Sequence, residues 1–510
     1  MELEIGSLHS GGLVVGVNPL ELAPNVFNDV ANVEFTREGV RPLRQPVTRN
    51  LDVPGSRLVY HAVDTMVNGG IRVVLCFCED KVYALRGSSY LDVTPAGMLS
   101  SKEWSVTEFN GYVVACNGKN FPYYYDFADA DSVLKILPEW PEELVPQKLS
   151  SMSGFLVFMG LVSDGTFANQ LIVWSDAAEL GSLPDNYNWA DPTSRAGFYS
   201  LPDFEEFVAA VLLNKSLIIY RTNSIYEMRF IGGTLVFSIE QRFEGKTLIS
   251  SKAVAAKGRL HYCIGENEFY VHDGSSEQVF DVRPVSDYYF NTVNPDYAYL
   301  TQMVYDQSQQ RLHICYPSGN DTLCTRDLFF DFKSNCWSLE LLDGYSYIGD
   351  VFISSTPQLI YEDANMTFED STDDFNLVYD KFSNNRLVYF NGSIFQVGGE
   401  SQVKQATLTR NLVAYTTQDT SGTTTVKRNL QLLITELWPK LYSGQVQFRL
   451  GFSETPLGTI TWSDWVSTNG LDRLDFFLSG LYLHLQIRNE GQDFTLNGYM
   501  LQAAPTGKIA

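Results

Sequence analysis

The sequence lacks the motifs that usually mark an enzyme. It contains no His-Glu-x-x-His, Gly-x-Ser-x-Gly or Gly-x-Gly-x-x-Gly pattern, which would indicate a zinc hydrolase, a serine hydrolase or a dinucleotide-binding protein. Gly245-Lys246-Thr247 is similar to the end of a phosphate-binding loop, but the glycine required five residues before Gly245 is replaced by Glu240. We therefore predict no enzymatic activity, no catalytic residues and no bound cofactor.

The sequence also has little positive charge. It contains 36 lysine and arginine residues against 60 acidic residues, which gives a formal net charge of −24, and it has no run of basic residues. A surface of that sign repels phosphates, so ordinary nucleic-acid binding is not expected. No stretch reaches the ~18 apolar residues of a membrane helix, and Met1–Glu4 lacks the basic and apolar start of a signal peptide. We expect no membrane insertion.

Cysteine is scarce and its spacing does not indicate a metal site. The seven cysteines are scattered without a Cys-x-x-Cys pair, and Cys76 and Cys78 would share one face of a strand. Buried free thiols are the favoured interpretation, with a disulfide or metal site as the alternative, and they indicate synthesis in a reducing cytoplasm. His261 and His313 each follow a leucine at the same place in two successive repeats, which favours a structural position over a shared metal site.

What the sequence does contain is a repeat of strand pairs. An apolar strand followed by a short turn and an aromatic-rich strand recurs six times, at intervals of roughly 40 to 60 residues, the length of a propeller blade. The first strands are residues 71–76, 111–116, 154–159, 215–220, 258–263 and 311–316, and a weaker seventh unit runs from Asp350 through Gln358–Tyr361.

Such small sheets cannot bury both faces alone, so radial packing is the natural arrangement. We predict an all-β fold with a β-propeller of six or seven blades over residues 56–375, the alternative being unrelated hairpins of a sandwich. Phe207–Leu213 and Ser216–Arg221 are expected to form a hairpin with its turn at Asn214-Lys215, in preference to a helix.

The two ends of the chain differ from the repeat. Residues 1–55 contain many Asn, Pro and Gly residues between isolated apolar ones, which is typical of an extended arm with short strands. Residues 376–510 contain six stretches of strand character, and alternation in one of them places Leu483, Leu485 and Ile487 on one face. We predict that the arm is part of a β-sandwich-like platform that the chain ends form together.

An acidic segment, residues 362–374, separates the two β regions and contains no basic residue. Its six carboxylates are Glu362, Asp363, Glu369, Asp370, Asp373 and Asp374. A solvated loop is one interpretation, and the wall or rim of a channel is another. A weak calcium site is less favoured because the EF-hand spacing is absent. A glycosidase pair is also less favoured, because adjacent carboxylates on a strand point to opposite faces.

Short motifs at both ends resemble a known family. They are Gly12-Leu13, Asn18-Pro19, Leu22, Pro24-Asn25, Asn32-Val33, Phe35, Gly39-Val40-Arg41, Arg44, Gly480–Ile487 and Phe494–Gly498. Their order resembles the opening and the ending of the tail hub and nozzle (packaged-DNA stabilisation) proteins of short-tailed bacteriophages. The family usually has Arg-Tyr after the glycine and Trp before the last glycine, where this chain has Leu481-Tyr482 and Phe494.

The resemblance implies a structural virion protein rather than an enzyme. Such proteins form a homo-hexameric ring below the portal and adaptor, with the chain ends as a platform and the propeller as the nozzle wall. The ring extends the DNA channel, retains the genome until ejection, carries fibres or spikes on its rim and holds a needle or plug below. The implied location is the virion tail, after assembly in the host cytoplasm.

A ring of six would carry a formal charge of 6 × −24 = −144, so we expect phage DNA to pass a net negative wall without specific binding. Two other classes remain open: a propeller enzyme acting on polysaccharide, and a monomeric propeller binding module.

Overall fold

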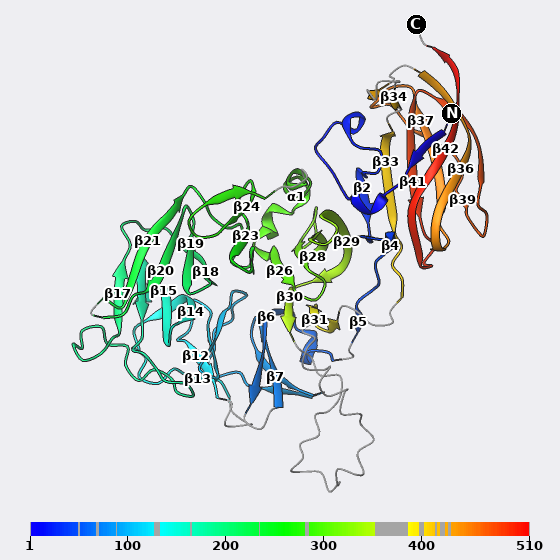
Figure 1. Cartoon of the computed structure of the whole chain (residues 1–510). Helices are drawn as coiled ribbons and strands as arrows, with labels where there is room; N and C mark the ends of the chain where they lie inside the picture. Colours follow the sequence, from blue (N-terminus) through cyan, green and yellow to red (C-terminus); the bar gives the residue numbers. More distant parts are fainter. Residues whose placement is uncertain are drawn as a thin grey trace, which may run out of the picture.

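The computed structural model describes most of the chain as β-structure (Figure 1). The described residues are 2–48, 51–67, 71–87, 89–126, 133–163, 166–233, 235–280, 285–351, 386–396, 402–413, 416–418, 424–426 and 430–508. Their helical elements are short: α1 (Ser286–Thr292), η1 (Leu8–Ser10), η2 (Pro19–Glu21), η3 (Pro54–Ser56) and η4 (Pro295–Leu300). Among these residues, no helix has the length and apolar character needed to cross a membrane.

Seven four-stranded antiparallel sheets follow one another along the described part of the chain, and we number them as blades 1 to 7. Blade 1 contains β6 (Val59–Val67), β7 (Ile71–Cys78), β8 (Val82–Arg86) and β9 (Ser89–Asp92). Blade 2 contains β10 (Ser105–Phe109), β11 (Tyr112–Cys116), β12 (Tyr123–Tyr125) and β13 (Lys135–Ile136). Blade 3 contains β14 (Val145–Met152), β15 (Phe155–Ser163), β16 (Thr166–Trp174) and β17 (Gly197–Ser200).

Blades 4 to 7 are β18 (Phe207–Leu213), β19 (Ser216–Arg221), β20 (Ser224–Phe230), β21 (Phe237–Glu244); β22 (Val254–Lys257), β23 (Leu260–Ile264), β24 (Phe269–His272), β25 (Glu277–Val279); β26 (Gln302–Asp306), β27 (Arg311–Tyr316), β28 (Cys324–Asp331), β29 (Cys336–Tyr345); and β30 (Tyr347–Val351), β31 (Arg386–Phe390), β32 (Ile394–Gln396), β5 (Val47–Thr48).

These sheets form a β-propeller, which confirms the predicted fold class with the higher of the two blade numbers. The six repeated units are the second and third strands of blades 1 to 6, and the expected hairpin of blade 4 is present, with Asn214 in its turn at φ 58°. The second strands are apolar on both faces because each face packs against a neighbouring blade. In β19, for example, Leu217 and Ile219 pack toward blade 3, whereas Ile218 and Tyr220 pack toward blade 5.

The seventh blade joins distant parts of the chain. Its hairpin is β31–β32, whereas the expected unit at Gln358–Tyr361 lies outside the described residues. Its fourth strand is β5, which pairs with β32 through Val47↔Gln396 and Thr48↔Phe395. An early strand thus covers the outer edge of the last blade, and β30 packs beside β6 of blade 1. Residues 47–48, placed by the sequence in the N-terminal arm, belong to this sheet; residue 375, the expected end of the propeller, lies outside the described residues.

The remaining strands form a sandwich of two sheets, the platform, with both chain termini at its far end (Figure 1). One sheet contains β3 (Val33–Thr36), β4 (Gly39–Pro42), β42 (Phe494–Lys508), β36 (Leu430–Gly444), β40 (Leu474–Gly480) and, also on β42, β1 (Glu2–Ile5). The other contains β2 (Asp29–Ala31), β33 (Thr407–Val413), β41 (Tyr482–Arg488), β37 (Gln447–Ser453), β38 (Thr461–Trp462) and β39 (Val466–Ser467). A two-stranded hairpin of β34 (Thr416–Gln418) and β35 (Thr424–Val426) is separate.

Both sheets of the platform contain strands from both ends of the chain, as predicted, but β31 and β32, which fall within the range 376–510 assigned to the platform from the sequence, belong to blade 7 because they pair with β30 and β5. The predicted alternation in β41 is also confirmed, since Leu483, Leu485 and Ile487 are all buried in the core between the sheets. All seven cysteines are free and buried, as expected for small apolar strand residues. Burial raises the pKa of Cys78 to about 12, so this thiol is unreactive at neutral pH.

Candidate functional site

The acidic segment lies outside the described residues, so its place relative to any channel stays a prediction. Glu362, Asp363, Glu369, Asp370, Asp373 and Asp374 all belong to it. In the described ranges, no three His, Cys, Asp or Glu side chains come together as a metal site requires. The structure shows three other features: the junction between platform and propeller, a hollow lined by lysines and glutamates of several blades, and two layers of buried polar side chains between blades.

The N-terminal segment binds the outermost strand of blade 6 through hydrogen bonds. The Leu13 amide donates to the Trp337 carbonyl at 2.9 Å, and the Asn32 amide donates to the Leu339 carbonyl at 2.8 Å. The Asn32 side chain also accepts from the Leu341 amide at 2.8 Å. These bonds cover the free edge of β29, which would otherwise expose unpaired backbone groups.

Gly12 is required for this approach. Its φ is +74°, and an added Cβ would lie 3.0 Å from the Cβ of Cys336. A larger residue at position 12 would push the N-terminal segment away from blade 6.

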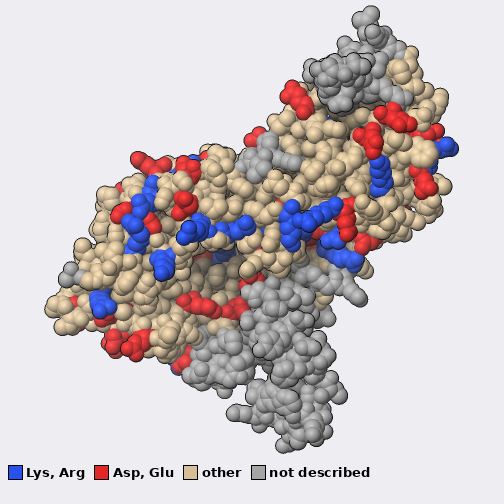
Figure 2. Space-filling model, viewed as in Figure 1, with Lys and Arg blue, Asp and Glu red and all other residues tan. Residues whose placement is uncertain are grey.

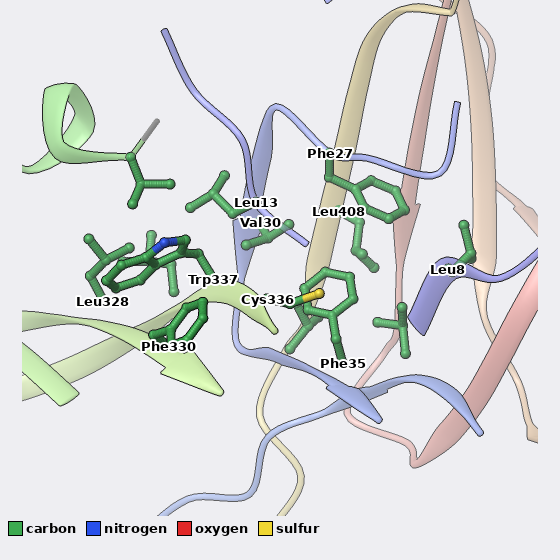
Figure 3. Close-up of a cluster of buried hydrophobic side chains, with 14 of the residues drawn as sticks. Leu8, Leu13, Phe27, Val30, Phe35, Leu328, Phe330, Cys336, Trp337 and Leu408 are labelled. Carbon is green, nitrogen blue, oxygen red and sulfur yellow. The ribbon is translucent and has the colours of Figure 1, made fainter. Parts of the chain in front are cut away.

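Apolar side chains make the junction part of one continuous core (Figure 3). Leu13, Phe27 and Phe35 approach β29 from the platform side. Phe330 and Trp337 of blade 6 belong to the same core, and the centroids of their two rings lie 5.1 Å apart. Burial of several large side chains across the junction resists rotation of the two units, because any relative movement would expose apolar surface.

A buried ion cluster lies beside this core. The Arg311 guanidinium binds Glu34 of β3 and donates through Nε to Asp331 Oδ2 at 2.9 Å, and its side chain is only 10% exposed. Burial alone would lower the pKa of Arg311, but the two carboxylates more than offset it and the net shift is upward. Arg41 binds the same Glu34 from the solvent side. Glu34 therefore connects a platform strand to the propeller.

A second buried pair joins the C-terminal half of the platform to blade 6. Lys404 Nζ lies 2.7 Å from Glu340 Oε1, and both side chains are less than a tenth exposed. The same ammonium donates to the Leu341 carbonyl at 2.6 Å. Burial raises the pKa of Glu340 despite the opposing effect of Lys404. Both chain ends are thus attached to β29 by polar contacts that exclude water.

Several residues that carry the family resemblance lie at this junction or in the platform beside it. Gly12, Leu13 and Asn32 contact β29, and the two terminal motif stretches lie side by side, since Val40 pairs with Leu496 and Arg44 binds Asp493 at 2.7 Å. Figure 2 shows Lys and Arg side chains gathered where the two units meet. The sequence did not identify Arg311. A signal was available, because Arg311 stands in an apolar strand and the next strand carries two aspartates four residues apart, Asp327 and Asp331.

A hollow of about 650 Å³ among several blades is lined by four lysines and three glutamates, which are Lys102, Lys119, Lys148, Lys252, Glu79, Glu103 and Glu206. The first strands of neighbouring blades pack together and so lie nearest the axis. Lys148 pairs with Glu103 at 3.1 Å. Lys252 donates to the Tyr60 carbonyl and lies 5.0 Å from the Tyr347 ring centroid, and burial lowers its pKa to about 8. Sequence reasoning missed this group because its members come from different blades.

Between blades 4 and 5, two histidines and a tyrosine form a chain of hydrogen bonds. His272 Nδ1 accepts from the Gly274 amide at 3.1 Å, so its Nε2–H donates to the Tyr220 oxygen at 2.7 Å. The Tyr220 hydroxyl then donates to His261 Nδ1 at 2.8 Å, and His261 Nε2–H donates to the Leu212 carbonyl at 3.0 Å. Each polar atom has a partner when both rings are neutral. Burial accordingly lowers the pKa of both histidines to about 4.

His313 has different surroundings because it is the third residue of β27, whereas His261 is the second residue of β23, so the two side chains point to opposite faces of their blades. His261 packs toward blade 4, whereas the His313 side of β27 faces blade 7. His313 Nδ1 donates to Asp327 Oδ2 at 2.6 Å, and Asp327 is fully buried. Burial alone would lower the pKa of His313, but Asp327 reverses this and the net shift is upward. The structural position predicted for the two histidines therefore corresponds to two unlike layers.

Comparisons with known proteins add no functional information. No family model and no curated protein matches the chain. Among solved structures, similarity extends to virginiamycin B lyase from Staphylococcus aureus (9% identity over 68% of this chain and 98% of that one, TM-score 0.39) and to PorZ of the type-IX secretion system of Porphyromonas gingivalis (9% identity over 70% and 42%, TM-score 0.38). A fungal alcohol oxidase in complex with copper matches over 88% and 95% at 10% identity, with a TM-score of 0.30.

Proposed function

We propose that this chain is a structural subunit of a short-tailed bacteriophage tail, one of six in a hub or nozzle ring below the portal and adaptor. The observation that supports this best is the position of the two terminal motif stretches. They are separated by most of the sequence, yet they pair in one platform, as Val40↔Leu496 and Arg44–Asp493 demonstrate. The family resemblance implies a platform built from the chain ends, and this chain has one.

The junction suits a part that transmits load without bending. Backbone bonds to β29, a shared apolar core and two buried ion clusters attach the platform to blade 6. A loosely tethered pair of domains would have a smaller and more polar contact. In a ring of six, such a junction would hold every propeller at a fixed angle to the platform and so keep the channel open at constant width.

The charge balance favours passage of DNA without binding. Each chain has a formal net charge of −24, and every basic residue that neutralised a phosphate would add affinity and slow the duplex. Repulsion from an acidic wall reaches about one Debye length, roughly 8–10 Å at ordinary salt. The acidic residues 362–374 are the proposed rim or lumen segment of this wall.

The mass of the purified full-length chain tests the proposal. One chain has a mass of 57.4 kDa, so a closed ring of six would have about 344 kDa (6 × 57.4). Mass photometry should detect the larger species, alone or after addition of the adaptor protein. Electron microscopy of virions should then place the chain in the tail with sixfold symmetry. A persistent monomer in both conditions, or a position outside the tail, would favour a propeller binding module instead, and turnover of a polysaccharide would favour an enzyme.

A further inference from the structure

A cavity of about 620 Å³ lies beside the junction, between the platform strands β3 and β4 and blades 6 and 7. Its inner surface includes His313 and Phe329 of blade 6 and Tyr389 of blade 7. Its outer part includes Arg37 from the turn between β3 and β4, and Lys333 from the turn after β28. The ion cluster around Arg311 lies against one side. The ion cluster helps to attach the platform, but it does not account for the open space beside it, so the cavity requires its own explanation.

Three residues of the cavity lining have a buried polar atom without a hydrogen-bond partner among the described residues: His313 Nε2, Ser334 Oγ and the Tyr389 hydroxyl. His313 is 4% exposed and Tyr389 is fully buried, and among the described residues neither His313 Nε2 nor the Tyr389 hydroxyl has a hydrogen-bond partner. Most buried polar groups in proteins are paired, because an unpaired one loses its contacts with water without replacement. Three such atoms on residues that line one cavity point to a molecule that binds there, and His313 and Tyr389 are the two of these residues that are almost completely buried.

The chemistry of a ligand for this cavity follows from the groups that line it. His313 Nδ1 already donates to Asp327, and the upward shift of the histidine pKa favours a proton on Nε2 as well. The tyrosine hydroxyl is a second available donor. In the outer part, Arg37 and Lys333 are exposed cations without an ion pair in the described part of the chain. Hydrogen-bond donors in the inner part of the cavity and cations in its outer part favour a ligand with anionic oxygen atoms that accept hydrogen bonds.

Position in the repeat alone does not explain the open histidine nitrogen. His261 also follows a leucine in the second strand of its blade, but it faces the preceding blade, and both of its ring nitrogens are paired by protein groups. The cavity beside His313 is therefore a local property of blades 6 and 7 and of the N-terminal strands. Its lining carries five Lys and Arg residues and four Asp and Glu residues, a small positive excess in a strongly acidic chain.

We propose that the junction cavity is a binding site for a small oxoanion, a phosphate or carboxylate group, which accepts hydrogen bonds from His313 and Tyr389 and enters past Arg37 and Lys333. The ligand would fill the space where platform and propeller meet and would stabilise that contact by mass action. The site is a property of one chain, so it is independent of the proposed ring.

The experiment is calorimetric titration of the full-length chain with inorganic phosphate and, separately, with acetate, at constant ionic strength set with chloride. We expect one site for at least one of the two probes. Tyr389→Phe removes only an unpaired hydroxyl and should weaken binding at least about tenfold, the effect of one hydrogen bond to a charged group. Arg37→Gln with Lys333→Gln should weaken it as well.

Tyr499→Phe is the matched control. Tyr499 is also fully buried with an unpaired hydroxyl, but it lies in the platform core and does not line the cavity. Its substitution should leave the affinity for phosphate or acetate unchanged. The proposal is overturned if neither probe binds, if the two tyrosine variants lose affinity equally, or if chloride at the same ionic strength competes fully. None of these results depends on the mass of the assembly.

Discussion

The layer between blades 4 and 5 and the layer between blades 6 and 7 solve the burial of polar groups in opposite ways. In the first layer, His272, Tyr220 and His261 are neutral, and each donates one hydrogen bond to the next group in a chain that ends at the Leu212 carbonyl. In the second, Arg311 and His313 are held by carboxylates. Neutral groups need only correct tautomers, whereas buried charges need partners within contact distance. The second layer is therefore the more vulnerable to a single substitution.

The difference also explains why only one layer serves the junction. The charged layer lies beside β29, where Glu34 of the platform supplies one of the carboxylates. An ion cluster completed by a residue from the other unit forms only when the two units are docked. The neutral chain of the first layer is completed within the propeller, so it contributes to the ring of blades and not to the attachment of the platform.

The largest expected effect comes from removing the central cation of the charged layer. Arg311→Met leaves the buried Asp331 without its cation and leaves Glu34 with only the solvent-side Arg41, so we expect a loss of about 3–5 kcal/mol in the free energy of unfolding. Denaturant unfolding followed by tryptophan fluorescence measures it. Arg57→Met, which removes an exposed pair with Asp80, is the control and should cost less than about 1 kcal/mol. Equal losses would show that the buried cluster is no more important than a surface pair.

The neutral layer should respond less strongly. Tyr220→Phe removes the hydroxyl that joins His261 to His272 and leaves one ring nitrogen of each without a partner. We expect a loss of about 2–4 kcal/mol, since each unpaired buried group costs about 1–3 kcal/mol. Tyr499→Phe, where the hydroxyl has no partner among the described residues, should change the stability by less than about 0.5 kcal/mol.

The pH dependence of the free energy of unfolding should have opposite signs for the histidines of the two layers. For His261 and His272 the pKa is about 4 in the folded chain against 6.5 in the unfolded one, so their contribution is present above pH 6.5 and is lost as the pH falls toward 4. The loss is about 1.4 kcal/mol per pH unit for each histidine. His313 has a raised pKa, so its contribution is present at acidic pH and disappears as the pH rises through the folded pKa.

Unfolding curves at several pH values test this difference. His272→Gln should reduce the acid slope by about 1.4 kcal/mol per pH unit, whereas His313→Gln should leave the slope between pH 4 and 6.5 nearly unchanged. A wild-type stability that does not change across this range would contradict the tautomers assigned to the neutral layer.

The sequence predicted the blades because their signal is local. The hairpin of blade 4 and the alternation in β41 follow from a period of two and a turn residue, and the structure contains both. The sequence did not distinguish the surroundings of His261 from those of His313, because a leucine-histidine pair looks the same whichever neighbouring blade the histidine faces. The direction of a side chain depends on how the sheet packs, which is a property of contacts distant in the sequence.

The closing strand and the site residues were hidden for the same reason. Val47–Thr48 has no strong strand pattern and becomes a strand by pairing with β32. Glu34, Arg311 and Lys404 come from three distant parts of the chain, so no spacing connects them. The sequence offered one usable hint, charged residues inside apolar strands, which indicates that a buried partner exists without identifying it.

The smallest predicted effect concerns the two arginines that share Glu34. Arg41 reaches the carboxylate from the solvent side with a side chain that is 48% exposed, whereas Arg311 is buried on the other side. Water can replace Arg41 because its removal leaves Glu34 still paired with Arg311, so Arg41→Gln should cost less than about 1 kcal/mol. If Arg41→Gln were as harmful as Arg311→Met, Glu34 would need both cations, and the charged layer would extend to the surface. A double-mutant cycle with Glu34→Gln measures the coupling of each arginine separately, and we expect the coupling of Arg311 to be the larger.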